Sequence, residues 1–273
     1  MRLGFNGSTT GEADLLADAA AARWAGFDCL EVRAPKIERY LQDGTLESLR
    51  RALRETGPPV LSLNALEDCT IVSPARWPPV LARCRQMCAW ARALDCPYVV
   101  AVPSPRPAGM DDATVVVRTR QALLEIAAIA ADDGVRVGFE FLGFGWCSVS
   151  TLGFARRIVE GMGEPTVGLV IDTFHYYIGG SRLEDLDGLD PSRLFFVHLD
   201  DAEGRPRDTL TDAHRLMPGE GAIPLRAMVA KLSSLGFRGP YSVELFRPEY
   251  WAMDPPEVAR RAKESAERVL SSA

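Results

Sequence analysis

Four polar residues in the second half of the chain stand at the ends of short apolar runs, and their side chains are of the types that bind metal ions. They are Glu140, Asp172, His198 and Glu244. Side chains alternate along a β-strand, and in each run the apolar side chains share one face while the polar residue takes the other. Because the apolar faces must pack under helices, we expect these four side chains to point into a common interior, at the carboxyl ends of their strands.

Three carboxylates gathered in one place repel one another and resist ionisation. A divalent cation bound by all three together with the imidazole removes that repulsion. Taken singly, each residue is also explained as a rim residue with a local hydrogen bond. Their recurrence on four consecutive strands favours a site for one divalent metal ion. Three oxygen donors and one imidazole favour Mn²⁺, Co²⁺ or Mg²⁺, and Zn²⁺ is also compatible.

The elements that must position these residues alternate along the whole chain. Apolar runs predict strands at 3–6, 29–32, 60–64, 98–102, 135–140, 167–172, 194–199 and 241–244. The segments between them predict helices at 12–24, 46–55, 79–94, 113–131, 152–160, 183–189, 225–235 and 256–270. Eight β–α units without a linker indicate an α/β protein, a single (β/α)₈ TIM barrel domain over residues 1–273. The alternative is an open doubly wound sheet, but the chain has no glycine-rich nucleotide loop. The longest insertion, 200–223, then follows the seventh strand.

Charge and composition exclude several classes of partner. The 273 residues carry 31 Lys and Arg against 37 Asp and Glu, a net charge of −6. Nucleic acids and anionic membranes attract basic surfaces, so we expect neither as a partner. No apolar run approaches the roughly 18 residues of a membrane span, and the first residues do not resemble a secretory signal. We therefore expect a cytoplasmic protein. The six scattered cysteines include no C-x-x-C pair and are predicted to be buried free thiols.

Polar residues also occupy matching positions in the first half of the chain. Asn6 ends the first predicted strand, Glu31 lies opposite its apolar neighbours in the second, and Asn64 ends the third. Two interpretations remain open: these residues line the far wall of a site for a hydroxyl-rich ligand, or they fill the barrel and bond to internal partners.

The loops after the fifth and eighth predicted strands carry Trp146 and Arg247. The indole face can cover a polyol ring, and the guanidinium can reach a substrate oxygen. The alternatives also stay open, because the indole can pack between loops and Arg247 can pair with a nearby carboxylate.

Four stretches carry a resemblance to a known family: GFEFLG around Glu140, IDTFHYY around Asp172, FVHLDDAE around His198 and SVELFRPEYW around Glu244. With these motifs the chain resembles the xylose-isomerase-like barrel superfamily of sugar isomerases and epimerases. Their spacing, together with the 200–223 insertion, is most similar to the inosose isomerases (2-keto-myo-inositol isomerases) of inositol catabolism.

The resemblance implies roles for individual residues. The four strand-end residues would be the metal ligands, and Glu140 and Glu244 would also act as the acid–base pair. His175 matches a D-x-x-H substrate-binding position, and Asp201 matches an H-x-x-D position. For both, a purely structural role in the loop is the alternative.

The implied activity is a metal-dependent isomerisation of a polyol ketone, an inosose, by proton transfer through a metal-stabilised enediolate. Alternatives with the same machinery are a ketose 3-epimerase or sugar isomerase and an inosose dehydratase. A barrel that binds a sugar without turning it over is a further alternative. The superfamily also contains metal-dependent DNA-repair endonucleases, but three histidines and a negative charge disfavour that activity. The expected partner is a small polyol or ketose, and pairing into a homo-oligomer is compatible with such a barrel.

Overall fold

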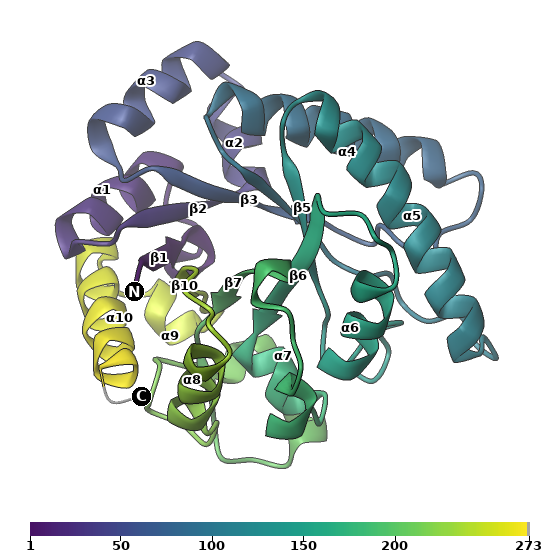
Figure 1. Ribbon diagram of the computed structural model, residues 1–273. Helices are drawn as coiled ribbons and strands as arrows, with labels where there is room; N and C mark the ends of the chain where they lie inside the picture. Colours follow the sequence, from purple (N-terminus) through teal and green to yellow (C-terminus); the bar gives the residue numbers. More distant parts are fainter. Residues whose placement is uncertain (272–273) are drawn as a thin grey trace.

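Eight parallel strands close into a barrel in the computed structural model, which describes residues 1–271 (Figure 1). Their order around the barrel follows the chain, and the last strand, β10, pairs with β1. The strands are β1 (Leu3–Asn6), β2 (Cys29–Arg33), β3 (Val60–Leu66), β4 (Tyr98–Ala101), β5 (Arg136–Glu140), β6 (Val167–Asp172), β7 (Leu194–His198) and β10 (Tyr241–Val243). Each predicted strand overlaps one of them, and the predicted TIM barrel is confirmed.

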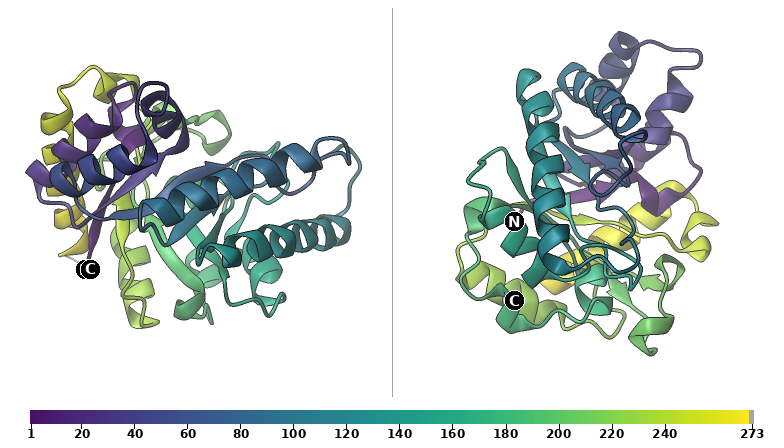
Figure 2. Two further views of the ribbon diagram at one scale, coloured as in Figure 1. Left: turned by 90° about the horizontal axis from the view of Figure 1, so that it is seen from above. Right: turned by 90° about the vertical axis from the view of Figure 1, so that its right-hand side faces the viewer.

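Helices surround the barrel on its outer side (Figures 1 and 2). The longer ones are α1 (Leu15–Ala25), α3 (Leu46–Thr56), α4 (Trp77–Ala93), α5 (Asp112–Asp132), α6 (Leu152–Glu160), α8 (Leu225–Ser234) and α10 (Pro255–Leu270). Figure 2 shows α4 and α5 running beside each other. The C-terminal helix α10 packs against α1, so the ring of helices closes as the ring of strands does (Figure 1).

Three short helices were not predicted from the sequence: α2 (Ala34–Tyr40), α7 (Thr173–Ile178) and α9 (Pro248–Trp251). Segments this short contain too few turns to show a helical period. The helix predicted at 183–189 is wrong in type and extent, because only a 3₁₀ helix forms there, at Leu183–Leu186. Asp187 directly after it adopts an extended conformation with φ −60° and ψ 129°, which ends the helical path.

The insertion after β7 contains a small antiparallel sheet, β8 (Asp201–Ala202) paired with β9 (Arg215–Leu216). Asp201 holds this insertion together, because its carboxylate accepts hydrogen bonds from three backbone N–H groups of the insertion at 2.9–3.0 Å. The sheet thereby fixes the position of Arg215, which reaches back to the barrel.

Two further expectations concern the whole molecule. All six cysteines are buried and unpaired, as predicted. Within residues 1–271, the helices are too short or too polar to cross a lipid bilayer.

A buried ion pair fixes the turn that follows β1. The Lys36 ammonium on α2 donates to Asp18 of α1 at 2.7 Å and to the carbonyl of Gly7 at 2.8 Å, and Thr10 also donates to Asp18. Burial raises the pKa of Asp18 to about 6 against the opposing effect of Lys36, so this carboxylate is ionised at pH 7.5. The pair anchors the turn next to Asn6, which contacts the site described below.

Replacing Asp18 with Asn should destabilise the fold, because it leaves the Lys36 ammonium buried without its counter-charge. Breaking a buried pair in this way costs about 3 kcal/mol or more. Urea unfolding at pH 7.5 measures the loss. Asp95→Asn is the matched control, since Asp95 pairs with Arg50 at the surface and exposed pairs contribute under about 1 kcal/mol. Equal effects of the two substitutions would contradict this account of the turn.

Candidate active site and metal centre

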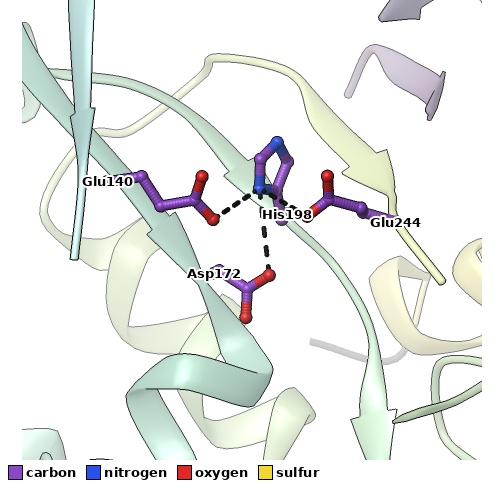
Figure 3. A group of neighbouring side chains, drawn as sticks. All are labelled: Glu140, Asp172, His198 and Glu244. Carbon is purple, nitrogen blue, oxygen red and sulfur yellow. Dashed lines mark hydrogen bonds and ion pairs between the residues drawn. The ribbon is translucent and has the colours of Figure 1, made fainter. Parts of the chain in front are cut away.

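Four side chains converge at the carboxyl ends of β5, β6, β7 and β10 (Figure 3). The Nδ1 atom of His198 lies 3.0 Å from Glu140 Oε1, 3.1 Å from Glu244 Oε2 and 3.8 Å from Asp172 Oδ2. One ligand atom from each of the four residues lies within 4.8 Å of the other three, and all four residues are buried. The structure therefore brings together the set predicted from the strand ends.

Glu31 on β2 fixes the orientation of the His198 ring by contacting Nε2, the ring nitrogen that does not face the other three carboxylates. Its Oε2 atom lies 3.1 Å from His198 Nε2 and also accepts a hydrogen bond from Ser62 at 2.5 Å. Burial opposes ionisation of Glu31, but His198 outweighs it and lowers the pKa of this carboxyl below its usual range. Since an ionised carboxylate only accepts hydrogen bonds, Nε2 carries the proton and Nδ1 is left to act as a ligand.

The two carboxylate oxygens of Asp172 make different contacts. Its Oδ1 atom caps α7 by accepting the backbone N–H of His175 at 2.7 Å, and its Oδ2 atom faces His198. The same Oδ2 accepts a hydrogen bond from Arg215 at 2.5 Å. Burial opposes the charge of Asp172, yet Arg215 and the two histidines keep the pKa of this carboxyl below its usual range.

Arg215 is a functional residue that the sequence analysis missed. It is 1% exposed, and its guanidinium contacts Asp172, Asp200 and Asp212 as well as the Nε2 atom of His175. A signal was present in the sequence. Unlike the other arginines of the insertion, Arg215 directly precedes an apolar pair, Leu216 and Met217, as a residue of a buried strand would.

His175 is neutral and has one free donor. Burial lowers the pKa of its ring below the usual value. Arg215 lies 3.2 Å from His175 Nε2, and because a guanidinium only donates, Nε2 is the acceptor and Nδ1 carries the proton. This Nδ1 atom has no hydrogen-bond partner within residues 1–271.

The donor set fits a divalent cation. Without one, burial and the neighbouring Glu140 raise the pKa of Glu244 to about 8, even though His198 opposes the rise. Burial alone would lower the pKa of His198, but the carboxylates of Glu244, Glu31 and Glu140 raise it well above its ordinary value. Without a cation, Glu244 and His198 therefore hold protons. The same four side chains could instead offer one nitrogen and three oxygen ligands to a metal ion. A cation that replaces those protons satisfies all four groups together.

A cavity of about 280 Å³ opens beside the cluster. Among the residues predicted to act in the site, Asn64, Glu140, Trp146, His175 and Glu244 line it. Trp146 is 52% exposed and stacks on Phe144, which contacts the ring of His175 edge-on.

The other residues predicted to bind substrate do not line this cavity. Asn6 donates to Glu244 Oε1 at 3.0 Å, and Glu31 supports His198. Asp201 bonds to its own insertion, and Arg247 pairs with Glu203 at 2.7 Å and with Glu249 at 3.2 Å. For these four residues the structure supplies protein partners, which supports the alternative, structural interpretation of each.

Comparisons with known proteins extend over the whole chain. A family model described as a xylose isomerase-like TIM barrel matches residues 19–269. The chain is 37% identical to an inosose isomerase of Halalkalibacterium halodurans, over 99% of this chain and 97% of the relative. It is 34% identical to an inosose isomerase of Bacillus subtilis strain 168, over 99% and 98%.

Superpositions on solved structures give the same fold over the whole chain. The crystal structure of the IolI protein with a zinc atom bound superimposes with a TM-score of 0.96 at 34% identity, covering 99% of this chain and 98% of that one. A D-psicose 3-epimerase of Clostridium cellulolyticum H10 has a TM-score of 0.77 at 19% identity, over 99% of both chains, and shares the fold.

Fold and site together define a TIM-barrel protein with a carboxylate and imidazole cluster at the carboxyl ends of its strands. The chain belongs to the xylose isomerase-like TIM barrel family.

Cation binding should release protons and depend on pH. Because the pKa of Glu244 is about 8 in the cation-free cluster, a proton must leave before the cation binds at pH 7. Since the raised pKa of the His198 ring means that it also holds a proton that the cation must replace, the apparent affinity should rise with pH through this range. Calorimetric titration with Mn²⁺ in buffers of different ionisation enthalpy measures both effects. An affinity that stays constant between pH 6.5 and 8.5 (roughly the range in which Glu244 titrates) would contradict this.

Replacing Glu31 with Gln should weaken cation binding by about 10- to 100-fold, the usual effect of removing a carboxylate that orients a histidine ligand. Titration with Mn²⁺ measures the change. Glu67→Gln is the matched control: Glu67 lines the same cavity but is exposed and makes no contact with His198. Comparable losses in both variants would indicate a general charge effect instead of a role for Glu31 in orienting the ring.

Proposed function

We propose that this protein is a divalent-metal-dependent isomerase that converts one inosose into an isomeric ketone. The observation that carries the proposal is the convergence of Glu140, Asp172, His198 and Glu244 beside a cavity, on a chain about one-third identical to inosose isomerases over its full length. The reaction moves a proton between two neighbouring carbons of an α-hydroxyketone.

A divalent cation held by these four residues would polarise the ketone and stabilise the negative charge of the enediolate. The donor set favours Mn²⁺, Co²⁺ or Mg²⁺, while the zinc atom in the related IolI structure supports Zn²⁺ as well. We propose Mn²⁺ as the first ion to test. A cytoplasmic location remains a prediction from the sequence.

Glu140 and Glu244 would supply the acid–base chemistry. Both carboxylates line the cavity, so a carbon-bound proton of a bound ketone lies within reach of one or the other. The two neighbouring carboxylates form ion pairs with basic groups: Asp172 pairs with Arg215, and Glu31 pairs with the His198 ring.

His175 would donate its Nδ1 proton to a substrate oxygen. The ring lines the cavity, and the contact between Nε2 and Arg215 fixes the tautomer in which Nδ1 is the donor. A neutral donor can stabilise charge on the reacting oxygen without first binding a proton from solvent. Asp172 caps the helix that carries His175, so the donor and the cation ligand keep a constant relative position.

The cavity wall would select a hydroxyl-rich ring. The exposed Trp146 and its stacking partner Phe144 offer a flat apolar face. Asn64 also lines the cavity and offers polar atoms, together with Arg33, which donates to the Asn64 side-chain oxygen at 3.2 Å. Support for direct contact with substrate is strongest for His175, Trp146 and Asn64. For Asn6, Glu31, Asp201 and Arg247 we propose support of the site through neighbouring groups.

Incubation of the Mn²⁺-loaded protein with 2-keto-myo-inositol in heavy water tests the proposal. NMR should show an isomeric ketone of unchanged mass apart from solvent deuterium. Loss of water would indicate a dehydratase, and an inverted hydroxyl centre with the ketone in place would indicate an epimerase. An unchanged spectrum from protein that demonstrably holds the ion would overturn the proposal.

Glu140→Gln and Glu244→Gln should each lower turnover by about 10²-fold or more, the usual contribution of a positioned acid or base. Steady-state rates, with the bound ion quantified in every sample, provide the measurement. Trp24→Ala is the control, because Trp24 is an exposed residue of α1 outside the cavity lining. Near-normal turnover in either glutamine variant would show that its residue is not required.

A further inference from the structure

Arg33 is the last residue of β2 and comes two residues after Glu31. Side chains alternate along a strand, so Arg33 faces the barrel interior as Glu31 does, one layer nearer the carboxyl end. The neighbouring strand β3 has the same layers: Ser62 donates to Glu31, and Asn64 pairs in register with Arg33 and accepts a hydrogen bond from its guanidinium at 3.2 Å. Arg33 accordingly lines the cavity.

Most of the hydrogen-bond donors of Arg33 have no partner in the protein. A guanidinium carries five N–H groups, and within residues 1–271 Arg33 forms one hydrogen bond, to Asn64. Its Nη1 atom also lies 4.0 Å from Glu244 Oε1, which is beyond hydrogen-bond distance. Arg215 lines the cavity as well, but its guanidinium contacts three aspartates and His175. Arg33 is therefore the lining guanidinium that has donors left for a ligand.

The ring of Phe246 holds the Arg33 guanidinium in place. The Arg33 Cζ atom lies 5.3 Å from the centre of this ring, within the range of a cation–π contact. The hydrogen bond to Asn64 fixes the guanidinium from a second direction. A planar group that is already held in this way loses little conformational freedom when it binds a ligand.

Arg33 and His175 are carried by opposite sides of the barrel. In the closed ring of eight strands β2 and β6 are four places apart, and His175 lies on α7, directly after β6. The four residues of the candidate metal centre come from β5, β6, β7 and β10, which are consecutive in the ring. A cyclic ketone whose reacting carbons face this centre would present its remaining carbons towards β2.

The charges around the cavity favour a neutral ligand for these donors. Glu67 and Asp68, in the loop after β3, also line the cavity, and neither has an ion-pair partner within residues 1–271. An anionic group next to Arg33 would meet their repulsion. A hydroxyl avoids it, because its oxygen can accept from the guanidinium while its proton is donated to a carboxylate.

We propose that Arg33 is a specificity-determining residue that donates hydrogen bonds to one or two ring hydroxyls on carbons that are not next to the ketone. This inference rests on the proposed isomerase function and concerns the part of the substrate in which no bond changes. Contacts to such remote groups orient the reacting carbons, so their loss lowers kcat/KM.

A cycle that combines a protein substitution with a substrate deletion tests the proposal. Arg33→Met removes the donors and retains an unbranched side chain over Phe246. With the Mn²⁺-loaded protein, kcat/KM is measured for 2-keto-myo-inositol and for its three monodeoxy analogues, each lacking one hydroxyl that is not next to the ketone. Arg33→Met should lower kcat/KM for the parent ketone by about 10- to 100-fold, the usual effect of losing hydrogen bonds from a charged group. For at least one analogue it should have little further effect, because the contact is already lost.

A structural role for Arg33 would give a different pattern. Asn64 links Arg33 to Glu244, so a structural loss would act through that carboxylate on every substrate. An equal decrease for all four ketones would therefore overturn the proposal, as would normal kcat/KM of Arg33→Met with the parent ketone. The bound ion is quantified in every sample.

Two further variants complete the comparison. Arg39→Met is the matched control, since Arg39 lies on the adjoining helix α2, is exposed and pairs with Glu12 at the surface; it should leave all four values unchanged. If Arg33→Met does not fold, Arg33→Lys replaces it. Lysine keeps the charge but lacks the planar fork of donors, so a smaller decrease with the same dependence on the missing hydroxyl is expected.

Inorganic sulfate distinguishes a hydroxyl site from an anion site. The proposal predicts that sulfate raises KM for 2-keto-myo-inositol no more than chloride does at equal ionic strength. Competition by sulfate in the wild-type protein that disappears in Arg33→Met would overturn the proposal in favour of an anionic ligand.

The proposed function can fail separately from this inference. A wild-type protein that does not convert 2-keto-myo-inositol would overturn both. A wild-type protein that converts it, while Arg33→Met lowers kcat/KM equally for all four ketones, would overturn the role of Arg33 alone.

Discussion

The imidazole of His198 stands between four carboxylates, and the rest of the site depends on that crowding. Glu31 binds one ring nitrogen, while Glu140, Asp172 and Glu244 surround the other. Buried carboxylates this close together cannot all ionise without a positive charge among them. Either protons or a cation must supply it, and the one-nitrogen, three-oxygen geometry is that of a cation site. The closed barrel makes the crowding unavoidable, because strands placed far apart in the sequence end at one point.

The insertion after β7 supplies a positive charge, the Arg215 guanidinium, to the acidic cluster from outside the barrel. Arg215 reaches from β9 to Asp172 and Asp200, and it sets the tautomer of His175 at the same time. Asp201 holds this insertion through backbone hydrogen bonds. A single buried guanidinium therefore links Asp172 of the cluster to the His175 ring, which lines the cavity. Loops that carry such residues above a rigid barrel are a general way for this fold to vary its chemistry.

Strand positions and the convergence of the four cluster residues could be predicted from the sequence because buried parallel strands carry a strong apolar signal and alternation assigns each side chain to a face. Alternation does not show how far along the barrel axis an inward-facing side chain lies from the cavity. Glu31 was assigned correctly to the interior, but it contacts the Nε2 atom of His198 and does not line the cavity. Arg215 was missed because the insertion has no period, and its partners come from β6 and from the loop after β7. The short helix α7 depends on a cap from Asp172, a contact that local pattern does not reveal.

A crystal structure of the protein grown with Mn²⁺, with anomalous diffraction recorded to locate the ion, tests the central claim most directly. The account predicts one strong anomalous peak within about 2.6 Å of His198 Nδ1 and of one oxygen from each of Glu140, Asp172 and Glu244, the upper range of such bonds. A peak elsewhere, or a cluster that remains free of the ion at saturating concentration, would contradict it.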